Sequence, residues 1–158
     1  MLYQNKKLNI EEINQHQFLI FEIYKLTVCI LAMRMCELLK ATGISVDKKA
    51  VIQAALCHDL AMVGREERYK NRSDSWRSHP KDSVSVAREL VPDLEPNTES
   101  MIESHMWPIA GPAPRSKEAV ILNLADKWAS AADWVFFITG KKTGVAIRKK
   151  LDNENEET

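Results

Sequence analysis

Three histidines and two aspartates carry the residue types that bind metal ions. His58 and Asp59 are adjacent and follow the apolar run AALC, an unusual place for a pair whose only role is to be solvated. His79, His105 and Asp126 follow further along the chain. Imidazole and carboxylate groups suit divalent transition metals, and one carboxylate can bridge two ions. The sequence therefore predicts a metal site built from these five residues.

Each of these residues, taken singly, also has an ordinary structural explanation. His79 precedes Pro80 directly and is consistent with a residue at the start of a helix, while His105 and Asp126 are consistent with satisfied polar groups in a core. The position of Asp126 favours the metal hypothesis, because it stands inside the apolar run VILNLADKWA. A buried charge is costly unless it is paired or bound to a metal.

Helices are expected to bring these residues together, since strand patterns are nearly absent. Apolar residues recur at three- and four-residue steps from 10 to about 42, and Gly43 predicts the end of that helix. A second helix is predicted from Val46 or Asp47, with Asp47 as its N-cap, to Gly64. This helix would carry the adjacent histidine and aspartate into the interior of a bundle.

The remaining sequence adds more helices separated by loops. Residues 65–78 lack apolar periodicity and predict a loop, and a helix is predicted from about Pro80 to just before Pro92. The later segments are a short helix over 97–107 opened by Asn97 or Thr98, a proline-rich loop over 108–116, a helix over 116–140 closed by Gly140, and a weaker helix over 145–151. The expected fold is all-α, a compact bundle of about five to seven helices.

Composition narrows the class of protein. The chain has 158 residues, which suits a single domain, predicted here over 1–150 with a polar, acidic tail over 151–158. Lysine plus arginine equals aspartate plus glutamate at 22 each. No overall field therefore draws the protein to a nucleic acid polymer or an acidic membrane, and a phosphorylated ligand must be met by a local site.

Cysteine usage and hydropathy predict a cytoplasmic protein. Cys29, Cys36 and Cys57 lie in apolar helical patterns without a CxxC pair, so they are predicted to be reduced core residues. No secretory signal is expected, because the N-terminal residues contain no uninterrupted apolar stretch. The largely apolar stretch FLIFEIYKLTVCILAM is interrupted by Glu22 and Lys25 and predicts a buried helix instead of a membrane span.

The order of these motifs resembles the HD-domain metal-dependent phosphohydrolases, a family of PDEase-like helical proteins. AALCHDL resembles the defining His-Asp motif, and HPKDSVSVA resembles the histidine-bearing helix start of members with two metals. IESH resembles the next ligand segment, and ILNLADKWA resembles the final aspartate motif. Together these motifs span residues 52–130, and a helix over about 24–42 extends the resemblance to most of the chain.

The resemblance implies a role for each matched position. His58, Asp59 and Asp126 match the core metal ligands, and Asp59 matches the residue that bridges the ions when there are two. His79 and His105 match the ligands that create a second metal position. The implied cofactor is one or two divalent transition metal ions, of Mn, Fe, Ni, Co or Zn, and His58 and Asp59 are the implied catalytic pair.

One position departs from the family pattern. The family begins with a histidine in a helix, and the corresponding register here, YKLTVCILA, places Tyr24 at that position. Tyr24 is open to three interpretations: a direct phenolate ligand, a hydrogen-bond donor to a ligand, or a sign that one metal position is lost. His16 lies about two helical turns earlier, roughly 12 Å along the axis, and cannot occupy the same point of an unbroken helix. An exposed position near the helix start is its ordinary explanation.

The resemblance and the residues predict a phosphohydrolase. The expected reaction is hydrolysis of a phosphoester bond of a nucleotide or another small phosphorylated metabolite by metal-activated water. Lys81, expected near a helix N-terminus, and Arg65 are the predicted phosphate contacts, although a solvated surface explains both equally well. Arg68, Arg72 and Arg77 share the predicted loop and both explanations. The alternative function is a nucleotide-binding regulatory protein without turnover, which the tyrosine at the first ligand position favours.

Overall fold

The chain folds entirely into helices over the residues described by this computed structural model, 10–63 and 65–138. The elements in order are α1 (Ile10–Ala41), α2 (Lys48–Cys57), the 3-10 helix η1 (Leu60–Met62), α3 (Arg65–Arg68), α4 (Arg72–Leu90), α5 (Pro96–Ser104) and α6 (Lys117–Ile138). The all-α prediction is confirmed. The predicted helix over 145–151, the predicted tail and Gly140 lie outside the described residues.

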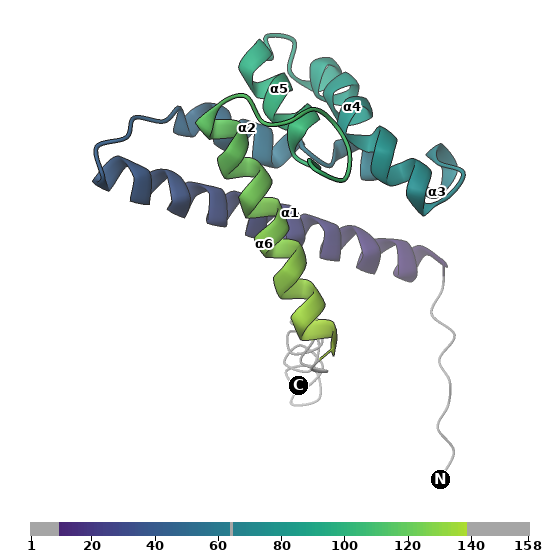
Figure 1. Ribbon diagram of the computed structural model, residues 1–158. Coiled ribbons are helices and arrows are strands. Elements are labelled where there is room, and N and C mark those ends of the chain that lie inside the picture. The colour runs from purple at the N-terminus through teal and green to yellow at the C-terminus, as the bar shows by residue number, and fades with distance from the viewer. Residues whose placement is uncertain (1–9, 64, 139–158) are drawn as a thin grey trace, which may run out of the picture.

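The two longest helices, α1 and α6, cross each other. The helix α2 lies between this pair and the rest of the bundle. α2 packs against α1 and α6 on one side and against α5 on the other, and α4 packs on α5 and η1. In Figure 1, α1 runs along one side of the molecule and α4 and α5 lie on the side away from it. Many buried core residues are small, which lets the helices approach closely: Ala32, Ala50, Ala54, Ala55, Ala87, Ala119, Ala125 and Ala129.

The predicted end of α1 at Gly43 is confirmed. Gly43 has a φ of 83°, which a residue with a side chain adopts only at a cost. Its N–H donates to the Lys40 carbonyl at 3.0 Å, and the Ile44 N–H donates to the Leu39 carbonyl at 2.9 Å. This is the pattern of a glycine-terminated helix.

The second predicted helix is correct at its start and too long at its end. The Asp47 side chain accepts the Ala50 N–H at 3.0 Å and caps α2 as predicted. The helix ends at Cys57, well before Gly64, and His58 is its C-cap. The apolar pattern continues because η1 also packs inward, with Ala61 buried and its N–H bound by the Ser83 hydroxyl at 3.1 Å. Asp59 therefore lies in the turn between two short helices.

The prediction of a loop over 65–78 and of a helix start at Pro80 is wrong. α4 begins at Arg72, capped by the Asn71 side chain, which accepts the Asp74 N–H at 2.9 Å. Pro80 therefore lies inside the helix. Apolar periodicity missed this segment because the buried face of α4 is polar at successive turns, with Ser75, His79 and Ser83.

The predicted cap of the short fifth helix is also wrong. α5 begins at Pro96, with Glu95 at the N-cap position, and not at Asn97 or Thr98. Proline suits the first helical position because its missing N–H would have no partner there. Thr98 is instead buried inside the helix.

Two predictions about the class of protein can be compared with the described residues. Cys29, Cys36 and Cys57 are buried and unpaired, as predicted. Among the described helices, none combines the length and the apolar character needed to cross a membrane.

The loop between α5 and α6 returns closely over the end of α5 at Gly111. This glycine has a φ of 75°, and a Cβ atom placed on it would lie 2.3 Å from the Glu103 carbonyl oxygen. Gly43 has a similar φ but open space around it. Substitutions at the two glycines therefore distinguish the free-energy cost of the backbone conformation from the cost of a steric clash.

We predict that Gly111→Ala destabilises the fold more than Gly43→Ala. A left-handed conformation costs an alanine roughly 1–2 kcal/mol at either position, and the contact with backbone adds to this at Gly111 alone. Urea unfolding of both variants and the wild type gives the two free-energy differences. Equal losses would show that the loop moves away without cost.

Candidate metal centre

Three histidines reach one point from three different helices. His58 and His105 are the C-caps of α2 and α5, and His79 lies in the middle of α4. Each ring is buried and donates its Nδ1 hydrogen to a backbone carbonyl of the preceding turn, since a carbonyl oxygen only accepts. The acceptors are Ala55 for His58 at 2.8 Å, Ser75 for His79 at 2.9 Å, and Ile102 for His105 at 2.6 Å.

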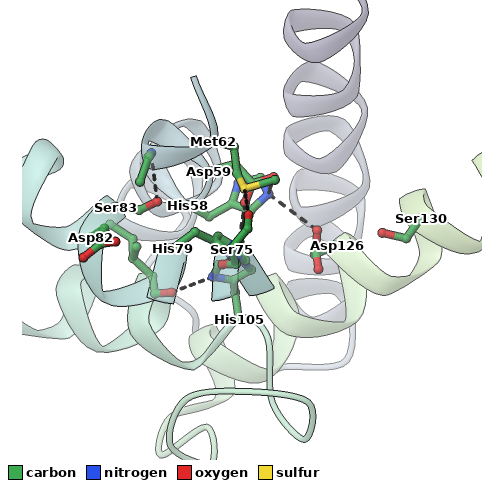
Figure 2. A network of polar contacts seen from close by, with 12 residues as sticks. His58, Asp59, Met62, Ser75, His79, Asp82, Ser83, His105, Asp126 and Ser130 are labelled. Atoms are coloured by element: carbon green, nitrogen blue, oxygen red, sulfur yellow. Dashed lines mark hydrogen bonds and ion pairs between the residues drawn. The ribbon is translucent and has the colours of Figure 1, made fainter. Parts of the chain in front are cut away.

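These backbone bonds leave the Nε2 atoms facing a common centre at Asp59. The nearest Asp59 carboxylate oxygens lie 3.2 Å from Nε2 of His79 and 3.5 Å from Nε2 of His58 and of His105. Figure 2 shows the three rings and Asp59 gathered together, with Asp126 facing them. Asp126 comes from α6, and its Oδ1 lies 3.5 Å from Nε2 of His58. All five residues predicted as ligands are thus brought together.

The charges of this cluster are strongly coupled. Burial alone would raise the pKa of Asp59, but His58, His105 and His79 outweigh burial and hold that pKa well below its usual range. Burial lowers the pKa of His58, yet Asp59 and Asp126 raise it to about 9. The pKa of Asp126 is lowered in the same way, against its burial, chiefly by His58. Two largely buried carboxylates therefore create a field that favours a cation.

The donor set fits a divalent transition metal. Nε2 of His58 is buried and has no hydrogen-bond partner among the described residues. Nε2 of His79 and of His105 lie only 3.0 Å apart, and in neutral rings that donate through Nδ1 both atoms are acceptors. His58, Asp59 and His105 offer donor atoms within 4.8 Å of one another. A cation between these atoms removes the repulsion and gives each lone pair a partner.

Tyr24 of α1 contacts this centre through Asp126. Its hydroxyl donates to Asp126 Oδ1 at 2.7 Å and lies 2.7 Å from the Ser130 hydroxyl. Burial, and then the negative charge of Asp126, raise the pKa of Tyr24 far above its usual value, so the hydroxyl keeps its proton. Of the three interpretations of Tyr24, this geometry favours the hydrogen-bond donor. His16 lies in α1, but its side chain is not among those described.

The two predicted phosphate contacts are not part of the cluster. Lys81 is exposed in the interior of α4, so the expected helix N-terminus beside it is absent and its predicted role loses that support. Arg65 is exposed at the start of α3.

Sequence reasoning missed the residues that hold His105 in place. The Asn123 side-chain amide donates to the carbonyls of His105 at 2.7 Å and Trp107 at 2.8 Å, and the Lys127 ammonium donates to the His105 carbonyl at 3.1 Å. Asn123 is buried on α6, one turn before Asp126. An asparagine inside the apolar run VILNLAD was the available signal, because a buried amide needs partners.

Comparison with protein families gives independent information about the chain. The model described as HD domain matches residues 26–131, which run from the middle of α1 to α6. The chain belongs to the HD-domain family. Proteins of this family bind divalent metals and are commonly metal-dependent phosphohydrolases. The match includes all five clustered residues but begins after Tyr24, so the comparison does not test the tyrosine position.

No curated protein and no solved structure shows significant similarity to the chain.

We predict that Tyr24→Phe weakens metal binding by about tenfold or more, because Asp126 loses the donor that orients it. The matched control is Tyr69→Phe, since the Tyr69 hydroxyl also donates to a carboxylate, Asp82 at 2.9 Å, outside the cluster. Competition with a chromophoric chelator measures the affinity of each variant. Equal affinities for the two variants would rule out the assigned role of Tyr24.

We predict that Asn123→Ala lowers both stability and metal affinity. Removing the amide leaves the Trp107 carbonyl without this donor and the His105 carbonyl with Lys127 alone, at roughly 1–3 kcal/mol, and loosens the end of α5 that carries His105. Asn97→Ala, at an exposed position of α5, is the control. Unfolding curves and chelator competition test the two effects separately. A variant that loses stability but binds metal normally would limit Asn123 to a structural role.

Proposed function

We propose that this HD-domain protein is a cytoplasmic enzyme that hydrolyses a phosphoester bond of a nucleotide or another small phosphorylated metabolite. The observation that supports this most is the buried Nε2 of His58, whose nearest carboxylate oxygens, on Asp59 and Asp126, both lie 3.5 Å away, too far for a well-formed hydrogen bond and spaced to admit a cation. Buried polar atoms in a folded protein normally have partners, and a bound cation would supply this one. Family membership supports the same class of reaction.

The proposed metal ligands are the five clustered residues: His58, Asp59, His79, His105 and Asp126. Their nitrogen and carboxylate donors suit Mn, Fe, Ni, Co or Zn, as one ion or two. A bound divalent ion would supply a water of lowered pKa and neutralise charge on a phosphoryl oxygen. Asp59 lies near Nε2 of all three histidines, so its loss is expected to affect the whole set of proposed ligands.

The protein's own groups orient this donor set. The backbone carbonyls hold one hydrogen of each ring on Nδ1, so each Nε2 is directed inward, where an ion would take the place of any hydrogen it carries. Tyr24 gives its hydrogen to Asp126 and limits the orientations of that carboxylate. His58 and Asp59 form the proposed catalytic pair. The Asp59 side chain is 13% exposed and can be reached from solvent, while the adjacent His58 side chain is fully buried.

A nucleotide-binding protein without turnover is the second candidate. The observation that favours it is Tyr24 at the position that resembles the family's first histidine ligand. A tyrosine that keeps its proton contributes a hydrogen bond and no metal-ligand bond, so this site has one donor fewer. Both candidates bind a nucleotide or a similar phosphorylated molecule, but only the enzyme hydrolyses it.

We predict that the purified 158-residue chain retains divalent metal in near-stoichiometric amount and that Asp59→Asn removes most of it. The amide keeps the shape of the carboxylate but loses the charge that attracts the ion. Asp93→Asn, at an exposed position outside the cluster, is the control. Elemental analysis gives the metal content, and phosphate release from phosphomonoesters, phosphodiesters and nucleotides gives the activity.

The outcomes separate the candidates. Metal retention with hydrolysis that both fall in Asp59→Asn supports the enzyme. Metal retention and nucleotide binding with no hydrolysis of any substrate class supports the binding protein. Trace metal in the wild type, with no uptake when ions are added back, would contradict the metal centre.

A further inference from the structure

A second polar site lies beside the metal centre, at the junction of α3 and α4. A pocket of about 310 Å³ opens there, lined by Arg65, Tyr69, Lys70, Asn71, Arg72 and Ser75. Three of these residues carry a positive charge and none carries a negative one. The pocket lies within the segment 65–78, which the sequence predicted to be a loop whose arginines were open to two interpretations, phosphate contacts or solvated side chains.

The cationic side chains of the pocket are available to a ligand. Among the described residues, no ion pair joins Arg65, Lys70 or Arg72 to a carboxylate. The nearby Asp74 carboxylate accepts the backbone N–H of Lys70 at 3.2 Å. The guanidinium of Arg72 lies 4.6 Å from the centre of the Trp76 ring, and this stacking limits its motion. Such a group is prepared to bind an oxyanion with little loss of entropy.

The start of α4 adds to the positive field of the pocket. Asn71, its N-cap, and Arg72, its first residue, both line the pocket. The N-terminal end of a helix carries a partial positive charge and free N–H groups, so it favours an anion. The helix end and the three cationic side chains therefore act in the same direction, and the Asp74 carboxylate in the first turn of α4 offsets part of their field.

One residue connects the pocket to the metal centre. Ser75 lines the pocket, and its backbone carbonyl accepts the Nδ1 hydrogen of His79. The two residues are four apart in α4, so one helical turn, about 6 Å along the axis, separates them. Figure 2 shows Ser75 directly beside His79 and the cluster. The pocket and the His79 ring are therefore neighbours along α4.

We propose that this pocket is a binding subsite for a phosphate-type oxyanion carried by the substrate whose ester bond is cleaved at the metal centre. The proposal rests on the phosphohydrolase function and narrows its substrates to molecules with a second phosphate group, such as bisphosphorylated metabolites or nucleotides with more than one phosphate. Free phosphate has the same chemistry, and the experiments distinguish it from a group on the substrate.

The first experiment measures binding of inorganic phosphate to the 158-residue chain by calorimetry. The double variant Lys70→Gln with Arg72→Gln removes two charges from the pocket, and Lys49→Gln with Arg115→Gln removes two exposed charges outside it. We expect phosphate affinity to fall about tenfold or more in the pocket variant and to stay unchanged in the control. Equal affinity in both would overturn the proposal. Should the double variant fail to fold by circular dichroism, Lys70→Gln alone carries the comparison.

The second experiment separates the pocket from the metal centre. Asp59→Asn is expected to lose metal but to keep the phosphate affinity that depends on Lys70 and Arg72. That result supports the pocket even where no hydrolysis is found, so the proposed function can fail without it. Complete loss of phosphate binding in Asp59→Asn would assign the anion to the metal centre and overturn the pocket.

The third experiment identifies the source of the anion by steady-state kinetics. For a group on the substrate, the pocket variant raises KM for a substrate with two phosphates and leaves KM for a matched monophosphate unchanged. Unchanged KM for both substrates, together with weaker binding of inorganic phosphate, would overturn the substrate source and identify free phosphate as the ligand.

Discussion

The proposed metal centre depends on the hydrogen bonds between three histidine rings and the backbone carbonyls of the turns that precede them. Each bond fixes a proton on Nδ1 and directs the opposite nitrogen toward Asp59. The bonds need a helical turn before each histidine, since the acceptor lies three or four residues earlier. Helix lengths and end points in α2, α4 and α5 are therefore part of the chemistry, because a shift by one residue would turn a ring away from the centre.

A buried group of two carboxylates and three imidazoles is costly to fold without a cation. Removing charge from water costs several kcal/mol unless the charge is paired, and like groups at close range add to the cost. The surrounding core offsets part of this by burying apolar side chains, many of them alanines, where α1, α2 and α6 meet. The stability of the polar interior is expected to rise when an ion binds there.

The sequence predicted the structure correctly at positions where a single residue type determines the local backbone conformation. Gly43 ends α1 and Asp47 caps α2 because backbone geometry and capping chemistry act locally. The sequence also singled out the five residues that the fold gathers, because imidazole and carboxylate groups in apolar surroundings have few other uses. The start of α4 was missed because its buried face is polar and leaves no apolar period. Asn123 was missed because its partners lie on another segment, and only the folded chain brings them together.

Tyr24 shows how one position changes the chemistry that a shared fold supports. A histidine would offer a lone pair to the centre, whereas the tyrosine hydroxyl gives a hydrogen to Asp126 and receives one from Ser130. The hydrogen bond fixes the orientation of the carboxylate toward the cluster. Under the proposed function, a site in which Tyr24 orients a carboxylate but supplies no ligand of its own has one donor fewer and would leave more of its ion open to a substrate. Substrate groups that bind elsewhere on the protein would then contribute more to affinity, which is the role proposed for the cationic pocket at the start of α4.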